Sequence, residues 1–357
     1  MPQQVSVRQS WTAILAATTS KLLLATLCLS ACNLSQQVNL ADLGFVVYGT
    51  GIEPGSQRGL ATNGAVIALS GTRGYVTWSL DHGETFTGRL TIDEKLDYRD
   101  VEILNDGRTI VLMSAGPGEA STVVRVELMG TKTLLRSALV NTEAEGFWDG
   151  IAFWNGSNRG VLVGDPIDGK LTVMITDDGG VSYRNASNPP DVGDRQYCFA
   201  ASGTSLVTLS QNTVLIATGG TESQVWCSED GGDNWQAIEI PFISGSDGSG
   251  VFSIAFKDAL HGVIVGGDYE HPEVNEQVAA YTNDGGLTWM ASTVMTGGYR
   301  SAVDWLGEYD AWFAVGPDGC DWSRDGVEWH AGPIGFKGHT IVEGWSSFVE
   351  GKLLKLD

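Results

Sequence analysis

The chain has 357 residues, and its 43 acidic residues against 21 lysines and arginines give a formal net charge of −22 at pH 7. Such an acidic balance excludes a basic nucleic-acid-binding surface. The 47 glycines and 12 tryptophans, without any long charge-laced amphipathic helix pattern, indicate an all-β protein with many tight turns.

Residues 1–31 have the features of a lipoprotein signal peptide. Lys21 precedes an apolar stretch that ends in the letters LSAC (29–32) and is too short to span a membrane as a permanent helix. These four letters resemble a bacterial lipobox, which implies cleavage before Cys32 and lipidation of its thiol. Residues 32–42 would then form a lipidated tether. The alternative is an ordinary secretory signal with a chance cysteine.

The residue after the predicted lipid attachment site suggests where the protein is sorted. Asn33 stands where inner-membrane lipoproteins of Gram-negative bacteria carry a retention aspartate. We therefore expect an outer-membrane lipoprotein that faces the periplasm and binds the membrane through its lipid; a secreted or soluble periplasmic protein is the alternative. Loss of Arg8 and Lys21 with the signal would change the formal net charge from −22 to −24.

A turn motif, Ser/Thr-x-Asp-x-Gly-x-x-aromatic, occurs four times along the chain. The copies are SLDHGETF, TDDGGVSY, SEDGGDNW and TNDGGLTW, with Asp81, Asp178, Asp230 and Asp284 at the third position. An Asp carboxylate can accept backbone N–H groups of its own turn, and Gly supplies a positive φ. Each copy follows a run of strand formers. We therefore expect hairpin turns in which these aspartates are structural rather than catalytic or metal-binding.

The spacing of the motif predicts a β-propeller. Successive aspartates are 97, 52 and 54 residues apart, so a repeat without the motif should lie in the first gap, with its turn inside 121–138. A degenerate copy occupies 323–329. Strand-rich repeats of about 40 to 55 residues are typical of propeller blades.

Apolar segments at the head of each repeat give the number of blades. Six of these segments are 57–62, 98–103, 147–153, 198–204, 250–256 and 298–305, and a seventh begins at 338. The segment 43–51 is a further strand, and its pairing with the C-terminal strand around 352–356 would close the ring and remove exposed edges. Residues 43–357 are therefore predicted to form a single domain, a seven-bladed β-propeller with four-stranded blades, closed by pairing of the N- and C-terminal strands.

The motif resembles the Asp-box, or bacterial neuraminidase, repeat of sialidases, sortilin-type receptors and the photosystem II stability/assembly factor family. Segments such as YRDVEIL, FWDGIAFW and GVFSIAFKDALHGVIVGGDY resemble the bacterial propellers grouped with the last family, over nearly the whole chain after residue 43. The resemblance implies a propeller and, through the assembly factor, protein binding. Such sequences often carry an oxidoreductase label, but no sequence feature here indicates a redox cofactor.

Alignment of the blade heads suggests a site on the rim of the central channel. Equivalent positions fall at Arg58, Arg99, Trp148, Phe199, Phe252, Arg300 and His339. Arginine pairs in a planar fork with carboxylate or phosphate, so three arginines on one rim predict an anion site. The candidate rim residues are Arg58, Arg99, Arg300, Trp148, Asp149, Asp165, Asp268, Tyr299 and His339. Alternatively, each arginine pairs with a nearby acid such as Asp100, Asp149, Asp165 or Asp268.

The function best supported by the sequence is non-catalytic binding or assembly of a protein partner or anionic ligand, by a monomer without cofactor or metal. Sialidases also hold a carboxylate with three arginines, but their Arg-Ile-Pro signature is absent here and no Tyr–Glu nucleophile pair can be assigned. A glycan-active, sialidase-like hydrolase is the alternative. It would need two acids across the pocket, from Asp149, Asp165 and Asp268. An oxidoreductase is the third and weakest class.

Three cysteines lie within the predicted propeller, Cys198, Cys227 and Cys320. Their odd number and wide spacing do not form a disulfide framework. We expect buried free thiols, with a Cys198–Cys227 bridge as the alternative. The five histidines show no metal-ligand spacing.

Overall fold

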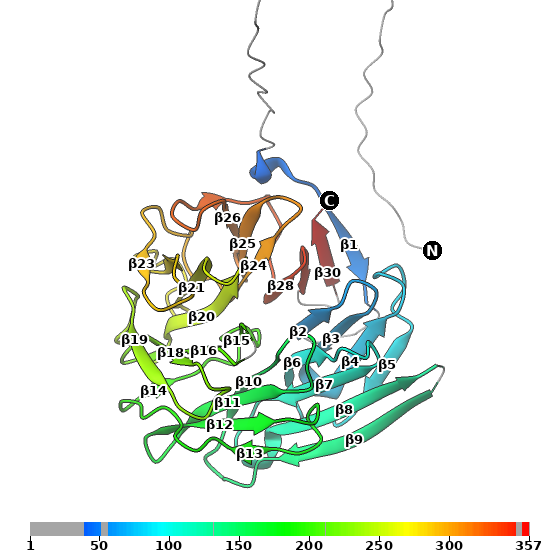
Figure 1. The fold of residues 1–357 in the computed structure, drawn as a ribbon. Coiled ribbons are helices and arrows are strands. Elements are labelled where there is room, and N and C mark those ends of the chain that lie inside the picture. Colours follow the sequence, from blue (N-terminus) through cyan, green and yellow to red (C-terminus); the bar gives the residue numbers. More distant parts are fainter. Residues whose placement is uncertain (1–38, 51–55, 131, 211, 348–351, 357) are drawn as a thin grey trace, which may run out of the picture. The chain divides into compact units, whose positions relative to one another are not determined.

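The computed structural model contains a ring of β-sheets around a central axis (Figure 1). The residues that it describes are 39–50, 56–130, 132–210, 212–347 and 352–356. Leu40–Asp357 form one compact unit. The predicted signal peptide and Cys32 lie outside the described residues, so lipid anchoring stays a prediction.

Seven antiparallel sheets, numbered here as blades 1 to 7, follow one another around the ring. Blades 1 to 3 consist of β2 (Gln57–Thr62), β3 (Ile67–Gly71), β4 (Tyr75–Ser79) and β5 (Gly88–Thr91); β6 (Tyr98–Ile103), β7 (Thr109–Ser114), β8 (Thr122–Met129) and β9 (Lys132–Val140); and β10 (Trp148–Phe153), β11 (Gly160–Ile167), β12 (Lys170–Thr176) and β13 (Arg184–Asn185).

Blades 4 to 6 repeat the same order of four strands. They consist of β15 (Leu206–Thr208), β16 (Val214–Ala217), β18 (Gln224–Ser228) and β19 (Gln236–Glu239); β20 (Ser249–Phe256), β21 (Gly262–Asp268), β22 (Ala279–Thr282) and β23 (Met290–Ala291); and β24 (Ala302–Leu306), β25 (Ala311–Gly316), β26 (Gly319–Ser323) and β27 (His330–Ala331). The sheet of blade 5 gains two short strands on its inner side, β14 (Gln196–Tyr197) and β17 (Gly219–Gly220).

Blade 7 joins the two ends of the propeller. Its strands are β28 (Thr340–Val342), β29 (Trp345–Ser347), β30 (Lys352–Leu356) and β1 (Phe45–Gly49), with β1 on the outside. The antiparallel register runs from Phe45 opposite Leu356 to Gly49 opposite Lys352. Both the number of blades and their closure by terminal strands are therefore confirmed.

The core of the propeller lies between neighbouring blades. The second strands are apolar runs buried on both faces; every residue of β7, for example, is buried. Between blades 1 and 2, Ala68 and Val76 pack against Tyr98 and Ile110. Strands buried on both faces read as continuous hydrophobic segments, which is why these runs do not alternate with polar residues.

The described helices are three single-turn 3-10 segments, η1 (Leu40–Asp42), η2 (Thr72–Gly74) and η3 (Gly118–Ala120). Across the described ranges, no helix is long and apolar enough to cross a membrane. Cys198, Cys227 and Cys320 are buried and free, as expected.

The repeated aspartates lie in the turns between the third and fourth strands of blades 1, 3, 4 and 5. Each carboxylate accepts the backbone N–H of the residue four positions later, at 2.8 to 3.0 Å. The Ser or Thr two positions earlier donates its hydroxyl to the same carboxylate. In blade 1 the hydroxyl of Ser79 lowers the pKa of Asp81 to about 2. Blade 2 joins β8 to β9 without the motif, inside the predicted 121–138.

Candidate binding pocket on the channel rim

A loop from blade 4 spans the central channel. Residues 198–204 are predicted to form an inner strand, but they form a loop, and the inner strand is β15, which begins at Leu206. The Ser202 hydroxyl donates to the carbonyl of Ser301 at 2.8 Å, and Thr204 bonds Ser253 at 2.7 Å. These contacts reach blades 5 and 6, so we call residues 198–204 the plug loop.

A glycine lets the plug loop turn against blade 2. Gly203 has a φ of +76°, and a Cβ at this position would lie 2.2 Å from Asp100 Oδ1. Asp100 cannot easily move away, because its carboxylate accepts the N–H groups of Val101 and Ile151 at 2.8 and 2.7 Å. The sequence 198–204 therefore crosses the channel rather than extending as a strand.

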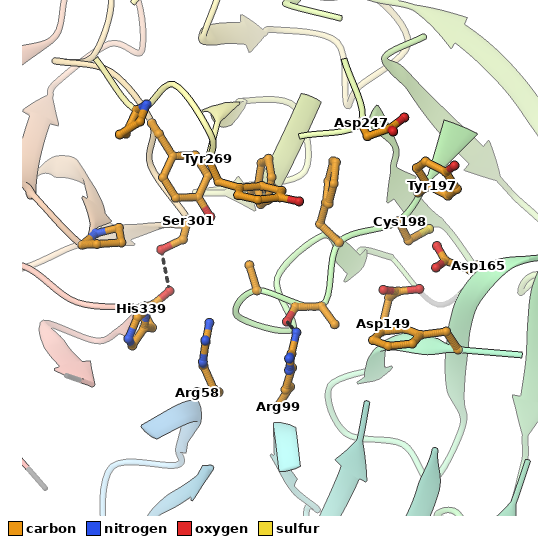
Figure 2. Close-up of a pocket in the computed structure, with 18 of the residues that line it drawn as sticks. Arg58, Arg99, Asp149, Asp165, Tyr197, Cys198, Asp247, Tyr269, Ser301 and His339 are labelled. Carbon is orange, nitrogen blue, oxygen red and sulfur yellow. Dashed lines mark hydrogen bonds between the residues drawn. The ribbon is translucent and has the colours of Figure 1, made fainter. Parts of the chain in front are cut away.

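The plug loop forms the floor of a pocket of about 680 Å³. Figure 2 shows its lining side chains, which come from five of the seven blades and from the loops between them. The lining falls into three parts. They are a cationic side with Arg58 and Arg99, an aromatic wall that includes Phe252, and an acidic side with Asp149 and Asp165.

β-Bulges near the start of the inner strands supply the lining residues. In β2, β6, β10 and β20 the pairing register slips by one residue. The residues left without a cross-strand partner are Arg58, Arg99, Asp149 and Phe252, and all four line the pocket. A bulge leaves one residue unpaired and re-aims its side chain. The same bulge thus directs a side chain of a different kind into the pocket from each of these blades: a basic one from blades 1 and 2, an acidic one from blade 3 and an aromatic one from blade 5.

Two guanidinium groups with one shared counter-ion form the cationic side. Arg99 donates from Nε to Asp97 at 2.9 Å and from Nη1 to the carbonyl of Ala200 at 3.3 Å. Arg58 Nε is buried, and among the described residues it has no hydrogen-bond partner. Burial lowers the pKa of Arg58, the charge of Arg99 lowers it further, and Asp97 offsets part of this. This side therefore carries an excess positive charge.

His339 lies beside Arg58 on the same side (Figure 2). Its backbone carbonyl accepts the Ser301 hydroxyl at 2.8 Å. Burial, and secondarily the charge of Arg58, lower the pKa of His339 to about 4. The imidazole is therefore neutral at neutral pH, and its buried Nε2 has no hydrogen-bond partner among the described residues.

Four aromatic rings form the wall. Phe199 of the plug loop stacks on Phe252 with ring centroids 4.0 Å apart. Tyr299 meets the Phe252 ring edge to face at 4.8 Å. Tyr269 lies 6.3 Å from the same ring and is 50% exposed at the mouth of the pocket. The wall offers apolar and aromatic contact area to a ligand held at the charged sides.

One buried and one half-buried carboxyl group form the acidic side. Asp149 is 1% exposed and Asp165 is half-buried, while the backbone N–H of Asp165 donates to the Phe147 carbonyl at 2.9 Å. Asp149 Oδ2 and Asp165 Oδ1 are buried without a hydrogen-bond partner in the described part of the chain. Burial, and then the charge of Asp165, raise the pKa of Asp149 well above its usual range. Burial raises the pKa of Asp165 to about 7.

Three predicted rim residues lie outside the pocket lining. Arg300 is buried, pairs with Asp321 through Nε and Nη2 at 2.7 and 2.6 Å, and donates from Nη1 to the Tyr299 carbonyl. The predicted convergence of three arginines is therefore wrong, and two converge. Asp268 is also buried and accepts the Ser246 hydroxyl at 2.8 Å.

Trp148 is the third residue outside the lining. It pairs with Gly164 and packs in the core between blades 2 and 3, 2% exposed. The register slip makes Asp149 the equivalent of Arg58 and Arg99, so the predicted position of Trp148 is wrong by one residue. Matching the apolar residue two positions after each bulge (Leu60, Val101 and Ile151) would have given the correct alignment.

Several lining residues do not stand at the aligned rim position of the blade heads. Tyr197, Asp247 and Asp318 line the pocket, as does the thiol of Cys198, whose pKa is raised by burial. These residues lie in loops or, for Tyr197, in the short strand β14, and they do not repeat from blade to blade, so their place on the rim could not be predicted from the sequence. Within the described ranges, no group of three or more His, Cys, Asp or Glu side chains is arranged to hold a metal ion.

Comparisons with known proteins support the fold. No family model matches the chain, and no curated protein matches it. A structure of YCF48 bound to a D1 peptide is similar over 87% of this chain and 96% of that chain, with a TM-score of 0.61 and 12% identity. YCF48 from Cyanidioschyzon merolae gives 0.59 at 15% identity, over 87% and 98%. The U3-55K structure gives 0.61 at 10% identity, over 87% and 98%. At such identities the likeness is one of fold.

Proposed function

We propose that this chain is a non-catalytic, protein-binding propeller whose rim pocket holds the carboxylate of a partner's peptide segment. The observation that carries the proposal is the state of Arg58. Its half-buried guanidinium lies beside a second guanidinium, and its buried Nε has no hydrogen-bond partner among the described residues. An incoming carboxylate would supply both the missing acceptor and the missing negative charge.

The electrostatics of the cationic side favour an anion over a neutral ligand. Positive charges held close together lower each other's pKa, as Arg99 does to Arg58. Asp97 is held by Arg99. A carboxylate bound between the two arginines would relieve this repulsion and gain bidentate hydrogen bonds. His339 is neutral near pH 7, so it would not compete for the anion.

The size and lining of the pocket suit a peptide. A volume of about 680 Å³ lies within the range of small-ligand sites and can take one or two side chains. The aromatic wall offers apolar contacts next to the charges. The structure of YCF48 with a D1 peptide is that of a propeller with a similar fold and a bound peptide. Together with the sequence resemblance to Asp-box propellers of the photosystem II assembly factor type, it favours a peptide ligand.

The proposed location is the periplasmic face of the outer membrane. This rests on the lipobox-like LSAC before Asn33. A protein lipidated at Cys32 would hold its propeller close to the membrane, since two or more acyl chains give lasting attachment. Cys32→Ser is expected to move the protein from the membrane fraction to the soluble periplasmic fraction. Unchanged fractionation of this variant would contradict the anchor and leave the binding proposal intact.

A glycan hydrolase fits the pocket less well. Asp149 and Asp165 lie together on one side of the pocket (Figure 2). Glycosidases place their two carboxyl groups on either side of the scissile bond. Asp268, the other predicted acid, lies outside the lining. We therefore favour binding.

The test compares N-acetylated pentapeptides that end in a free carboxylate with the same peptides ending in an amide. Titration calorimetry should show weaker binding of the amides to the wild-type protein. Arg58→Gln should weaken binding of the free acids by about tenfold or more, since hydrogen bonds to charged groups contribute about 1.5 to 3 kcal/mol. Arg58→Lys should fall between the two, because lysine keeps the charge and loses the planar fork.

The matched control is Arg89→Gln. Arg89 is an exposed arginine on β5 of the same blade as Arg58 and lies outside the pocket lining. This variant makes the same change in net charge and should leave peptide affinity unchanged. Equal binding of acids and amides, or equal losses in the Arg58 and Arg89 variants, would overturn the proposed function.

A further inference from the structure

The charged groups of the pocket are segregated rather than mixed. Figure 2 shows Arg58, Arg99 and His339 on one side and Asp149 and Asp165 on the other. Both sides line one continuous pocket. A carboxylate bound only to the arginines would not form hydrogen bonds with Asp149 and Asp165. The acidic side therefore points to a second contact with the ligand.

The acidic pair is incompletely satisfied by the protein. Asp149 Oδ2 and Asp165 Oδ1 are buried without a hydrogen-bond partner among the described residues. Asp149 itself is 1% exposed. Burying a polar atom without a hydrogen bond is costly, and burying two adjacent carboxylates is more so. Such an arrangement is typical of a site that a ligand completes.

Neighbouring groups do not neutralise the pair. Arg99 is the cation that acts on Asp149, but its guanidinium already bonds Asp97 and the Ala200 carbonyl. The Cys198 thiol has its pKa raised by burial and stays neutral. Two adjacent carboxyl groups with raised pKa values then share a proton at neutral pH. A cation with N–H donors could replace that proton and satisfy both oxygens.

An organic cation suits the site better than a metal ion. Among the described residues, no group of three or more metal-ligating side chains is present. A lysine or arginine side chain brings its own N–H donors and an alkyl stem that can lie along the aromatic wall of Phe199 and Phe252. The cationic side, a short distance away within the same pocket, would hold the carboxylate of the same ligand.

We infer that Asp149 and Asp165 form a second subsite that binds a basic side chain, so that the pocket selects peptide C-termini with lysine or arginine beside the terminal carboxylate. The inference rests on the proposed function, because it uses the carboxylate site at Arg58 and Arg99. It adds the class of partner: a protein whose chain ends in a basic residue.

The experiment uses four N-acetylated pentapeptides that differ only at the last residue, lysine or norleucine, with a free or amidated end. Norleucine has the length of lysine without its charge. With the wild-type protein near pH 8, replacing lysine by norleucine should weaken binding by about tenfold or more. In the double variant Asp149→Asn and Asp165→Asn the difference should shrink to about twofold or less. Asp168→Asn, at an exposed acid of blade 3 outside the pocket lining, is the control and should keep the full difference.

A second measurement needs no variant. Replacement of the shared proton by a cation releases it, so the lysine peptide should bind more tightly as the pH rises from about 5.5 to about 8, across the pKa of Asp165 near 7. The norleucine peptide should show no such change. His339, with its pKa near 4, does not titrate in this range. Asp100 beneath the plug loop does, because burial raises its pKa to about 7, and the norleucine peptide controls for its effect.

The outcomes separate the two proposals. If free acids bind better than amides but lysine and norleucine bind alike at every pH, the cation subsite is wrong and the carboxylate site survives. If lysine matters and amidation does not, the cation subsite survives and the carboxylate site at the arginines is wrong. If none of the four peptides binds at millimolar concentration, both are wrong.

Discussion

The aspartates in the outer turns and those in the rim pocket show what the same side chain does in opposite settings. Asp284 and its equivalents are partly exposed and hydrogen-bonded to their own turn. Asp149 is buried and Asp165 is half-buried, and each has a buried oxygen without a hydrogen-bond partner among the described residues. The pKa of Asp81 is lowered to about 2, whereas that of Asp165 is raised to about 7. The repeated aspartates stabilise the fold, whereas the unrepeated pair has oxygens whose hydrogen bonds we propose a ligand supplies.

The largest expected effect concerns the floor of the pocket. Gly203→Ala would place a Cβ at a φ of +76° and within 2.2 Å of Asp100 Oδ1, so it should lower the free energy of unfolding by about 3 kcal/mol or more. Gly64→Ala is the matched control, because Gly64 has a φ of +86° with open space around it. It should cost about 1 kcal/mol. Denaturant unfolding measures both, and equal losses would mean that the plug loop does not pack as described.

A smaller effect is expected at the outer turns. Asp284→Ala removes the acceptor of the Thr288 N–H and hydroxyl, at 2.9 and 2.6 Å, and should cost about 1 kcal/mol of stability. Peptide affinity should not change, because Asp284 lies outside the pocket lining. Titration calorimetry on the folded variant checks this. A loss of binding at unchanged stability would reverse the roles assigned to the two sets of aspartates.

The smallest effect is a difference in the pH dependence of stability. A turn aspartate has a lowered pKa in the folded state, so its contribution is present above about pH 4 and is lost as the pH falls toward about 2. The buried pair has raised pKa values, so the folded state binds extra protons and stability falls as the pH rises from about 4 to about 7.

Melting temperatures across this range would separate the two contributions. The difference between wild type and the double variant Asp149→Asn, Asp165→Asn should change between about pH 4 and pH 7, in favour of the variant at the higher pH. The difference between wild type and Asp284→Ala should change below about pH 4, since the pKa of Asp284 is also lowered. If both melting-temperature differences changed over the same pH range, the opposite pKa shifts assigned to the two sets of aspartates would be wrong.

The sequence predicted the fold because its signals were local and repeated. The turn motif, the apolar runs and the two terminal strands each depend on neighbouring residues, and they gave seven blades and the pairing of Phe45 with Leu356. The same repetition placed Arg58 and Arg99 on the inner strands, where they line the pocket together with Tyr299 and His339.

The errors arose where the outcome depends on geometry that the repeat does not carry. A register slip of one residue put Asp149 where Trp148 is predicted. Arg300, just before β24, is paired with Asp321 of β26, which is separated from β24 in the sheet by β25. The plug loop begins like a blade head, yet its contacts with Ser301 and Asp100 come from distant parts of the chain. Long-range contacts of this kind cannot be read from a repeat.

The pairing of β1 with β30 also imposes an order on folding. Blades 1 to 6 are built mainly from strands close in sequence, so each can form as soon as its own segment is available. Blade 7 needs the first strand and the last, and bringing such distant segments together is the slow, entropically costly step. Until then β30 has an unpaired edge that could template pairing with another chain. Pairing with β1 therefore covers the edge of β30 and protects the ring from edge-to-edge aggregation.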